Sequence, residues 1–85
     1  MSRITVCAVF DKAVEVFGRP FFVPASGQAM RSFIDEVNTA SDSVMYKHPG
    51  DFDLYFIASY NEHDGTFEPA RELLLKGSDV ESLRK

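Results

Sequence analysis

The chain has 85 residues, 45% of them hydrophobic, and a formal net charge of −4 at pH 7. A chain of this length closes one core, and its hydrophobic share, which includes eight Phe and no Trp, excludes a disordered protein. The acidic balance argues against the sequence-independent electrostatic grip on nucleic acid that basic domains use.

The only cysteine is Cys7, so an internal disulfide is excluded. A lone cysteine in a small domain favours a reducing compartment such as the cytoplasm, and we expect Cys7 to be a small buried hydrophobic residue. The N-terminal stretch lacks the small-residue cleavage site of a signal peptide. No apolar span reaches about 18 residues, so we expect no membrane helix.

The first predicted element is a strand in RITVCAVFDKA, residues 3–13. Both of its alternating faces are largely apolar, which is typical of a central strand, and one face carries Ile4, Val6, Ala8 and Phe10. Gly18 and Pro20 then indicate a turn. A brief edge strand is predicted at residues 21–23, because Pro24 lacks the N–H that a sheet ladder needs.

An amphipathic helix is predicted behind Ser26, which we expect to be its N-cap. At about 100° per residue the apolar side chains fall on one stripe, which consists of Ala29, Met30, Phe33, Ile34 and Val37. The stripe ends near Asn38. A polar loop follows, in which Pro49 and Gly50 mark a turn.

The longest predicted strand begins at Phe52. Its alternation places one set of apolar residues on a single face, namely Phe52, Leu54, Phe56, Ala58 and Tyr60, and puts Tyr55 on the other. Asp64-Gly65 is a strong hairpin signal, and the returning strand is expected to stop at Pro69. Residues 72–76 fit either a short strand or a helical turn, and residues 77–85 are predicted to be a flexible or oligomer-docking tail.

The predicted order is therefore β-β-α-β-β. We expect an α+β fold in residues 1–76, in which one helix packs on one face of a small antiparallel sheet of four to five strands. Eight Phe exceed what one helix covers, and a sheet edge is left unpaired. Both features favour a homo-oligomer, with a dimer preferred.

Catalytic and metal-binding patterns are weak in this sequence. His48 and His63 lie in predicted turns beside acidic residues, but they lack the i, i+4 spacing and the short spacing of metal motifs. Ser26-Gly27 lacks the preceding glycine of a nucleophile elbow. We predict no catalytic residue, no metal and no cofactor. A metal-dependent nuclease built on the two histidines is kept as an alternative, ranked below the two binding functions described at the end of this subsection.

Aromatic and basic residues around the predicted hairpin form the candidate nucleic-acid site. Single-stranded nucleic acid is bound by aromatic faces that stack on bases beside a basic track for the backbone. The residues of these two kinds are Arg19, Tyr46, Lys47, Tyr55, Tyr60 and Arg71. The tyrosines also suit ordinary strand positions or a dimer interface, so both interpretations stay open.

Five motifs follow one another along the chain: DKA (11–13), PFF (20–22), AMRSFIDEVN (29–38), KHPGDFDL (47–54) and EHDGTF (62–67). In this order they resemble the small nonstructural protein encoded by the fifth reading frame of gokushoviruses, a microvirus branch with circular single-stranded DNA genomes. KHPGDFDL and the ordered set carry the specificity, and the hairpin turn departs slightly from the family pattern. The resemblance covers most of the chain except about the last ten residues.

The resemblance implies a non-virion protein of the infected bacterial cytoplasm, with a role in viral DNA replication near the switch to single-stranded genome synthesis. It brings no catalytic residue with it. We therefore expect a non-enzymatic protein that binds single-stranded DNA as an oligomer and does not associate with membranes. The alternative, which the acidic balance favours, is an adaptor that docks a host or viral replication protein.

Overall fold

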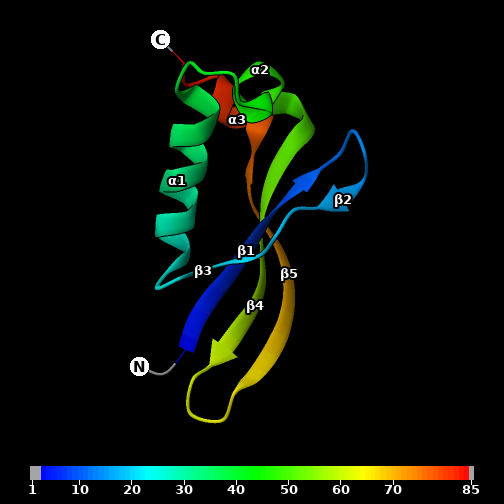
Figure 1. The fold of residues 1–85 in the computed structure, drawn as a ribbon. Helices are drawn as coiled ribbons and strands as arrows, with labels where there is room; N and C mark the ends of the chain where they lie inside the picture. Colours follow the sequence, from blue (N-terminus) through cyan, green and yellow to red (C-terminus); the bar gives the residue numbers. More distant parts are fainter. Residues whose placement is uncertain (1–2, 85) are drawn as a thin grey trace.

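Five antiparallel strands form one twisted sheet in the computed structural model, which describes residues 3–84 (Figure 1). The central strand β1 (Arg3–Asp11) pairs along its length with β4 (Phe52–Asn61), and β4 pairs in turn with β5 (Thr66–Lys76). Two short strands, β2 (Val16–Phe17) and β3 (Phe21–Val23), share the other edge of β1. The predicted α+β class with a small antiparallel sheet is confirmed.

Three helices and one 3-10 turn complete the fold. The long helix α1 (Ser26–Asn38) lies along one side of the sheet, and the short helices α2 (Val44–Lys47) and α3 (Gly77–Glu81) gather near its C-terminal end (Figure 1). The turn η1 (Pro49–Asp51) leads directly into β4. Sequence periodicity did not predict α2, α3 or β2, because each is too short to produce a repeating pattern.

The core lies between α1, α3 and one face of the sheet. Ala29, Phe33 and Val37 of α1 are buried there, while Met30 and Ile34 pack at its margin, so the predicted stripe is confirmed. The sheet and α3 supply the remaining buried members of this cluster, which are Cys7, Phe52, Leu54 and Val80. Each large apolar side chain buried in this way contributes about 1.5–3 kcal/mol.

The helix start differs from the sequence prediction by one residue. Ser26 is the first residue of α1, and the N-cap position belongs to Ala25, whose methyl side chain has no atom that could accept a capping hydrogen bond. Ala25 has the extended backbone of a cap residue, and its carbonyl accepts a hydrogen bond of 3.1 Å from the Gln28 amide. The backbone alone closes the first turn, so the Ser26 hydroxyl is not needed there.

The returning strand does not stop at Pro69 but runs on as β5 to Lys76. Proline is tolerated because β5 pairs only with β4 and forms an edge of the sheet, where a missing N–H breaks no second ladder. The register between the two strands also shifts between Phe56 and Ala58, close to the proline. Residues 72–76 are therefore the end of one long strand, not a separate strand or a helical turn.

Residues 77–84, part of the predicted flexible or oligomer-docking tail at 77–85, pack against the rest of the protein, and Lys85 lies outside the described residues. Val80 of α3 is 1% exposed and belongs to the core cluster. The Arg84 guanidinium donates to the backbone carbonyls of Val37 and Tyr46, and it lies 4.2 Å above the Tyr46 ring. The terminal carbonyls of a helix need such donors, so Arg84 closes the C-terminal end of α1.

Gly77 is what permits α3 to pack so closely. A Cβ atom built at this position would clash with the carbonyl oxygen of Pro49 and lie 2.5 Å from that of Phe52. Both obstacles are backbone atoms, which cannot rotate away as a side chain does. The glycine therefore lets the end of β5 approach the KHPGDF turn, residues 47–52. This turn is itself held near the end of β1 by a 2.7 Å hydrogen bond from the Lys12 amide to the Asp51 carbonyl.

Substitution of Gly77 tests this contact. Gly77→Ala is expected to lower the free energy of unfolding by about 3 kcal/mol, because overpacking against fixed backbone forces α3 outward. The measurement is urea denaturation followed by circular dichroism. The matched control is Gly27→Ala in α1, where nothing lies within 4 Å of the added methyl group, and its expected change lies between zero and about 1 kcal/mol of stabilisation. Equal midpoints for the two variants would contradict the close packing of α3.

Candidate nucleic-acid interface

The face of the sheet opposite α1 is called the open face below. Directly paired residues of antiparallel strands lie on the same face, so the register assigns its members. Val6 and Ala8 alternate with the core residue Cys7, and they pair with Ala58 and Tyr55 respectively. The other residues that this register places on the open face include Ile4, Phe10, Phe17, Phe22, Asp53, Tyr60, Phe67 and Leu73.

A β-bulge decides which side of the sheet Tyr60 occupies. The β1–β4 register shifts between Val6 and Cys7, which pair with Ala58 and Phe56 and leave Ile57 as an extra residue of β4. The strict alternation expected from the sequence put Tyr60 on the same face as Phe56. The bulge reverses this from Ala58 onward, so Tyr60 shares the open face with Tyr55 and the prediction for this half of β4 is wrong.

Six aromatic rings of the open face form two clusters. In the Tyr55 cluster, the ring centroids of Phe10 and Phe17 are 4.7 Å apart, and Tyr55 meets Phe17 edge-on at 5.4 Å. The Tyr60 cluster, which consists of Phe22, Tyr60 and Phe67, has a centroid separation of 4.9 Å between Tyr60 and Phe67. Pairs of this geometry contribute about 0.5–1.5 kcal/mol beyond their buried area, which holds the rings in defined positions.

Arg71 lies on the Tyr55 cluster. Its guanidinium carbon is 5.2 Å from the ring centroid of Phe17 and 6.0 Å from that of Tyr55, which is the geometry of a cation–π contact. The residue as a whole is exposed. A positive charge is therefore held beside the rings while its donors remain available to a ligand.

Small side chains form the floor of the open face, and large rings stand above it. Val6, Ala8 and Ala58 are buried although they do not belong to the core cluster, so the surrounding rings cover them. Phe22 and Phe67, in contrast, are 53% and 55% exposed. The Tyr60 cluster therefore presents accessible aromatic surface of the kind that marks a binding site.

An ion pair closes the end of the open face nearest α3. Asp53 is only 5% exposed, and its Oδ1 atom lies 3.5 Å from the Lys12 ammonium. Lys76 is the register partner of Asp53 on β5. The carboxylate at this end therefore has the Lys12 ammonium beside it, and Arg71 with the two aromatic clusters lies between it and the β4–β5 hairpin.

The structure brings together three of the six predicted site residues and separates the others from them. Tyr55, Tyr60 and Arg71 lie on the open face. Tyr46 stacks under Arg84 among the helices, and Lys47 of the same helix lies 3.8 Å from the Asp42 carboxylate. The sixth residue, Arg19, is exposed in the connection between β2 and β3.

Four phenylalanines of the open face were absent from the predicted site: Phe10, Phe17, Phe22 and Phe67. The signal for Phe10 was available, since it alternates with Ile4, Val6 and Ala8 on one face of the first strand. Phe22 and Phe67 required knowledge of which strands are neighbours, which a single sequence does not contain. Their placement follows from the pairing of β3 with β1 and of β5 with β4.

Neither histidine belongs to a cluster of ligands. Within residues 3–84 no group of three or more His, Cys, Asp or Glu side chains is placed to hold a metal ion. The KHPGDF segment is a turn, as predicted, in which the carbonyl of His48 accepts a 3.0 Å bond from the Asp51 amide. In the hairpin turn, the His63 amide donates to Asn61, and hydrogen bonds from Thr66 lower the pKa of Asp64.

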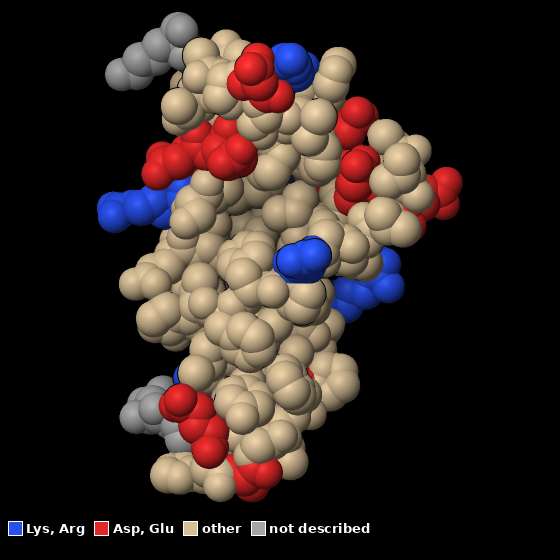
Figure 2. All heavy atoms as spheres, viewed as in Figure 1, with Lys and Arg blue, Asp and Glu red and all other residues tan. Residues whose placement is uncertain are grey.

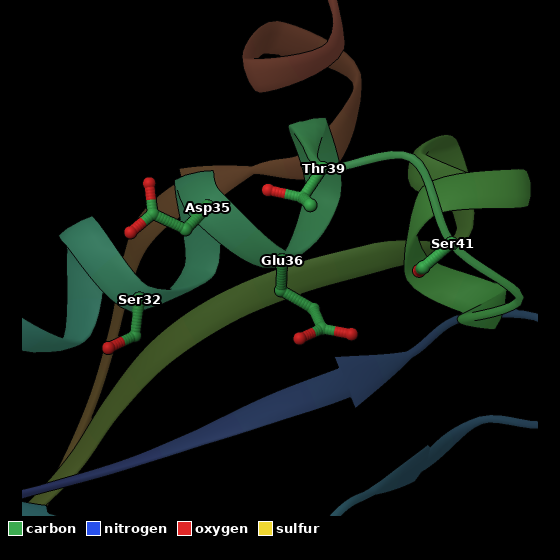
Figure 3. A pocket seen from close by; sticks show the side chains of 5 residues that line it. All are labelled: Ser32, Asp35, Glu36, Thr39 and Ser41. Carbon is green, nitrogen blue, oxygen red and sulfur yellow. The ribbon is translucent and has the colours of Figure 1, made fainter.

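Acidic side chains on α1 line a surface pocket together with Ser32, Thr39 and Ser41. The carboxylates of Asp35 and Glu36 point away from one another there, so they do not converge on a common ligand position (Figure 3). The space-filling view shows the wider charge distribution. Acidic groups lie mainly towards the two ends of the visible side, while the middle carries basic groups, one of them near the centre, among uncharged surface (Figure 2).

Comparison with known protein families identifies a match over most of the chain. A model of the family described as Phage ORF5 protein matches residues 4–80. No curated protein and no solved structure gives a significant match. No helix within residues 3–84 is long and apolar enough to cross a membrane.

Cys7 provides a test of the core between the helices and the sheet. The residue is fully buried, as the sequence predicted, and burial raises the pKa of its thiol. We expect the native protein at about pH 8 to react with a thiol reagent more than tenfold more slowly than the urea-unfolded protein, because both access and thiolate formation are reduced. The measurement is the rate of colour release from a chromogenic disulfide, and equal rates in the two states would show that the core opens readily.

Proposed function

The chain belongs to the phage ORF5 protein family, and on that premise we propose that it is a non-enzymatic, nonstructural protein of phage single-stranded DNA replication that binds single-stranded DNA. The observation that carries this proposal is the open face, where two aromatic clusters and Arg71 lie on one side of the sheet. RNA-recognition motifs bind single strands in a comparable way, through aromatic side chains on the exposed face of a four-stranded sheet. This comparison is an analogy of architecture and supports the mode of binding only.

The physical basis of binding would be stacking. An unpaired base has a π-face, and stacking on an aromatic side chain is worth about 1–3 kcal/mol per base. Phe22 and Phe67 offer the most accessible rings, and Arg71 adds a cation beside the Tyr55 cluster. In a duplex the base faces are already stacked on one another, so aromatic rings on the face of a sheet reach them only in a single strand.

We also propose that the protein is a homo-oligomer, with a dimer favoured, in the cytoplasm of the infected bacterium and outside the virion, and that the family member is of the gokushovirus type. Apolar surface for a second copy exists away from the open face. Val14, Val44 and Leu83 are each more than half exposed, in the β1–β2 connection and at the helical end of the molecule. A dimer formed through these residues would leave both open faces available to DNA.

A second candidate function is that of an adaptor which docks a host or viral replication protein. The net charge of −4 favours it, since an acidic protein repels DNA at long range. The open face itself is also compatible with a protein partner, because exposed Phe and Tyr are enriched in such interfaces. The two functions differ in whether purified protein alone retains an oligonucleotide.

Arg71→Gln tests the DNA-binding proposal. We expect it to weaken binding of a fluorescent single-stranded oligonucleotide by about threefold to tenfold at low salt, because a charge-assisted contact next to the rings is lost. Fluorescence anisotropy with unlabelled duplex as competitor measures the effect, and light scattering of the same sample gives the oligomeric state. The matched control is Arg31→Gln, since Arg31 is an exposed arginine of α1 on the other side of the sheet.

Equal losses in the two arginine variants would indicate a general charge effect and would contradict a site on the open face. Absence of binding by the unaltered protein at low salt would remove the DNA-binding proposal and favour the adaptor. In that case a protein recovered from nuclease-treated lysate would be purified and titrated against this chain, with the double variant Phe22→Ser/Phe67→Ser as the control for the open face.

A further inference from the structure

The two aromatic clusters occupy separate positions along the sheet. Tyr55 and Tyr60 lie five residues apart on the same strand, β4, which at about 3.3 Å per residue is a separation of about 16 Å. Each contacts two Phe from other strands of the sheet. The open face thus offers two aromatic stations, which line up along the direction of β4.

Charge is sparse between and around these stations. Arg71 is the cation in contact with the rings, and it touches only the Tyr55 cluster. Lys12 is paired with Asp53, and Arg3 is paired with Glu68 at 2.9 Å near the hairpin. A ligand on the open face therefore finds much aromatic surface and one or two cations for its phosphates.

We propose that the open face holds a single strand mainly through two of its unpaired bases, one at each cluster, with Arg71 as the principal phosphate contact. This inference rests on the proposed DNA-binding function and specifies its chemistry. At the Tyr55 cluster, the flat Arg71 guanidinium already lies on the rings, so it provides both a plane for a base and a charge for a phosphate. At the Tyr60 cluster, the exposed rings of Phe22 and Phe67 are the stacking surface.

Two quantitative consequences follow. A separation of about 16 Å corresponds to roughly five steps of a stacked strand at about 3.4 Å per step, so about six nucleotides are needed to occupy both stations. Salt dependence reports the number of phosphates neutralised, with a slope of about −0.7 per phosphate for single strands. With one or two such contacts, affinity falls only about threefold to sevenfold between about 50 and 200 mM salt.

The test compares labelled thymidine oligonucleotides of increasing length with an abasic oligonucleotide of the same length and charge, by anisotropy on the full chain. We expect the intact strand to bind at least about tenfold more tightly than the abasic strand. A step in affinity is expected once the length reaches about six nucleotides. The double variant Phe22→Leu/Phe67→Leu, which keeps these positions apolar, is expected to abolish the step, so that long and short strands bind the variant with similar affinity.

Each alternative result has a distinct meaning. Equal binding of intact and abasic strands, with a steep salt slope, would overturn the two-station inference while leaving DNA binding in place. A step that persists in the double variant would also overturn it. If no oligonucleotide binds at low salt, the proposed function fails, and this inference fails with it.

Discussion

The antiparallel pairing of β1 with β4, interrupted once by a bulge, is the constraint from which the rest of the molecule follows. Before the bulge, Phe52 and Leu54 of β4 point into the core against α1, while Tyr55 points the other way. After it, Ala58 and Tyr60 also point away from the core. One extra residue, Ile57, therefore places both tyrosines on the open face and lets one strand serve a hydrophobic core on one side and a line of aromatic rings on the other.

The helices of residues 3–84 cover only one face of the sheet. α1 and α3 fill the side that carries Cys7 and Leu54, and Arg84 ties their ends to α2 through the backbone of Val37 and Tyr46. No helix of residues 3–84 packs on the open face. The aromatic rings of that face cover the small side chains beneath them instead. The outer edge of β5 carries Pro69 and two register shifts, which are devices that discourage pairing with another strand. The exposed apolar side chains of Val14, Val44 and Leu83 are therefore a more suitable contact for a second copy than the edge of β5.

The long elements were predictable from the sequence, whereas contacts between distant segments were not. The stripe of α1 and the strand periodicity of β1 are strong local signals, and they gave the fold class, the buried Cys7 and the existence of the hairpin. The bulge at Ile57 has no such signal, so Tyr60 was assigned to the wrong face. The order of α3 depends on the fit of Gly77 against Pro49, a contact that no pattern near residue 77 reveals. For the candidate site, Tyr55, Tyr60 and Arg71 could be named from residue type alone. Their phenylalanine neighbours could be identified only from the strand order. Tyr46 and Lys47 were wrongly included, because they belong to the short helix α2 and lie away from the open face.

The pairing of β1 with β4 also has a kinetic side. The two strands at the centre of the sheet are separated in the sequence by residues 12–51, so this long segment must be closed into a loop before the central ladder can form. The β4–β5 hairpin and α1 involve only local contacts and can form early, whereas β1, which is synthesised first, must wait for β4 with its apolar faces exposed. During phage infection, when the protein is made on the host's ribosomes, this waiting strand is the part of the chain most exposed to aggregation and to capture by chaperones.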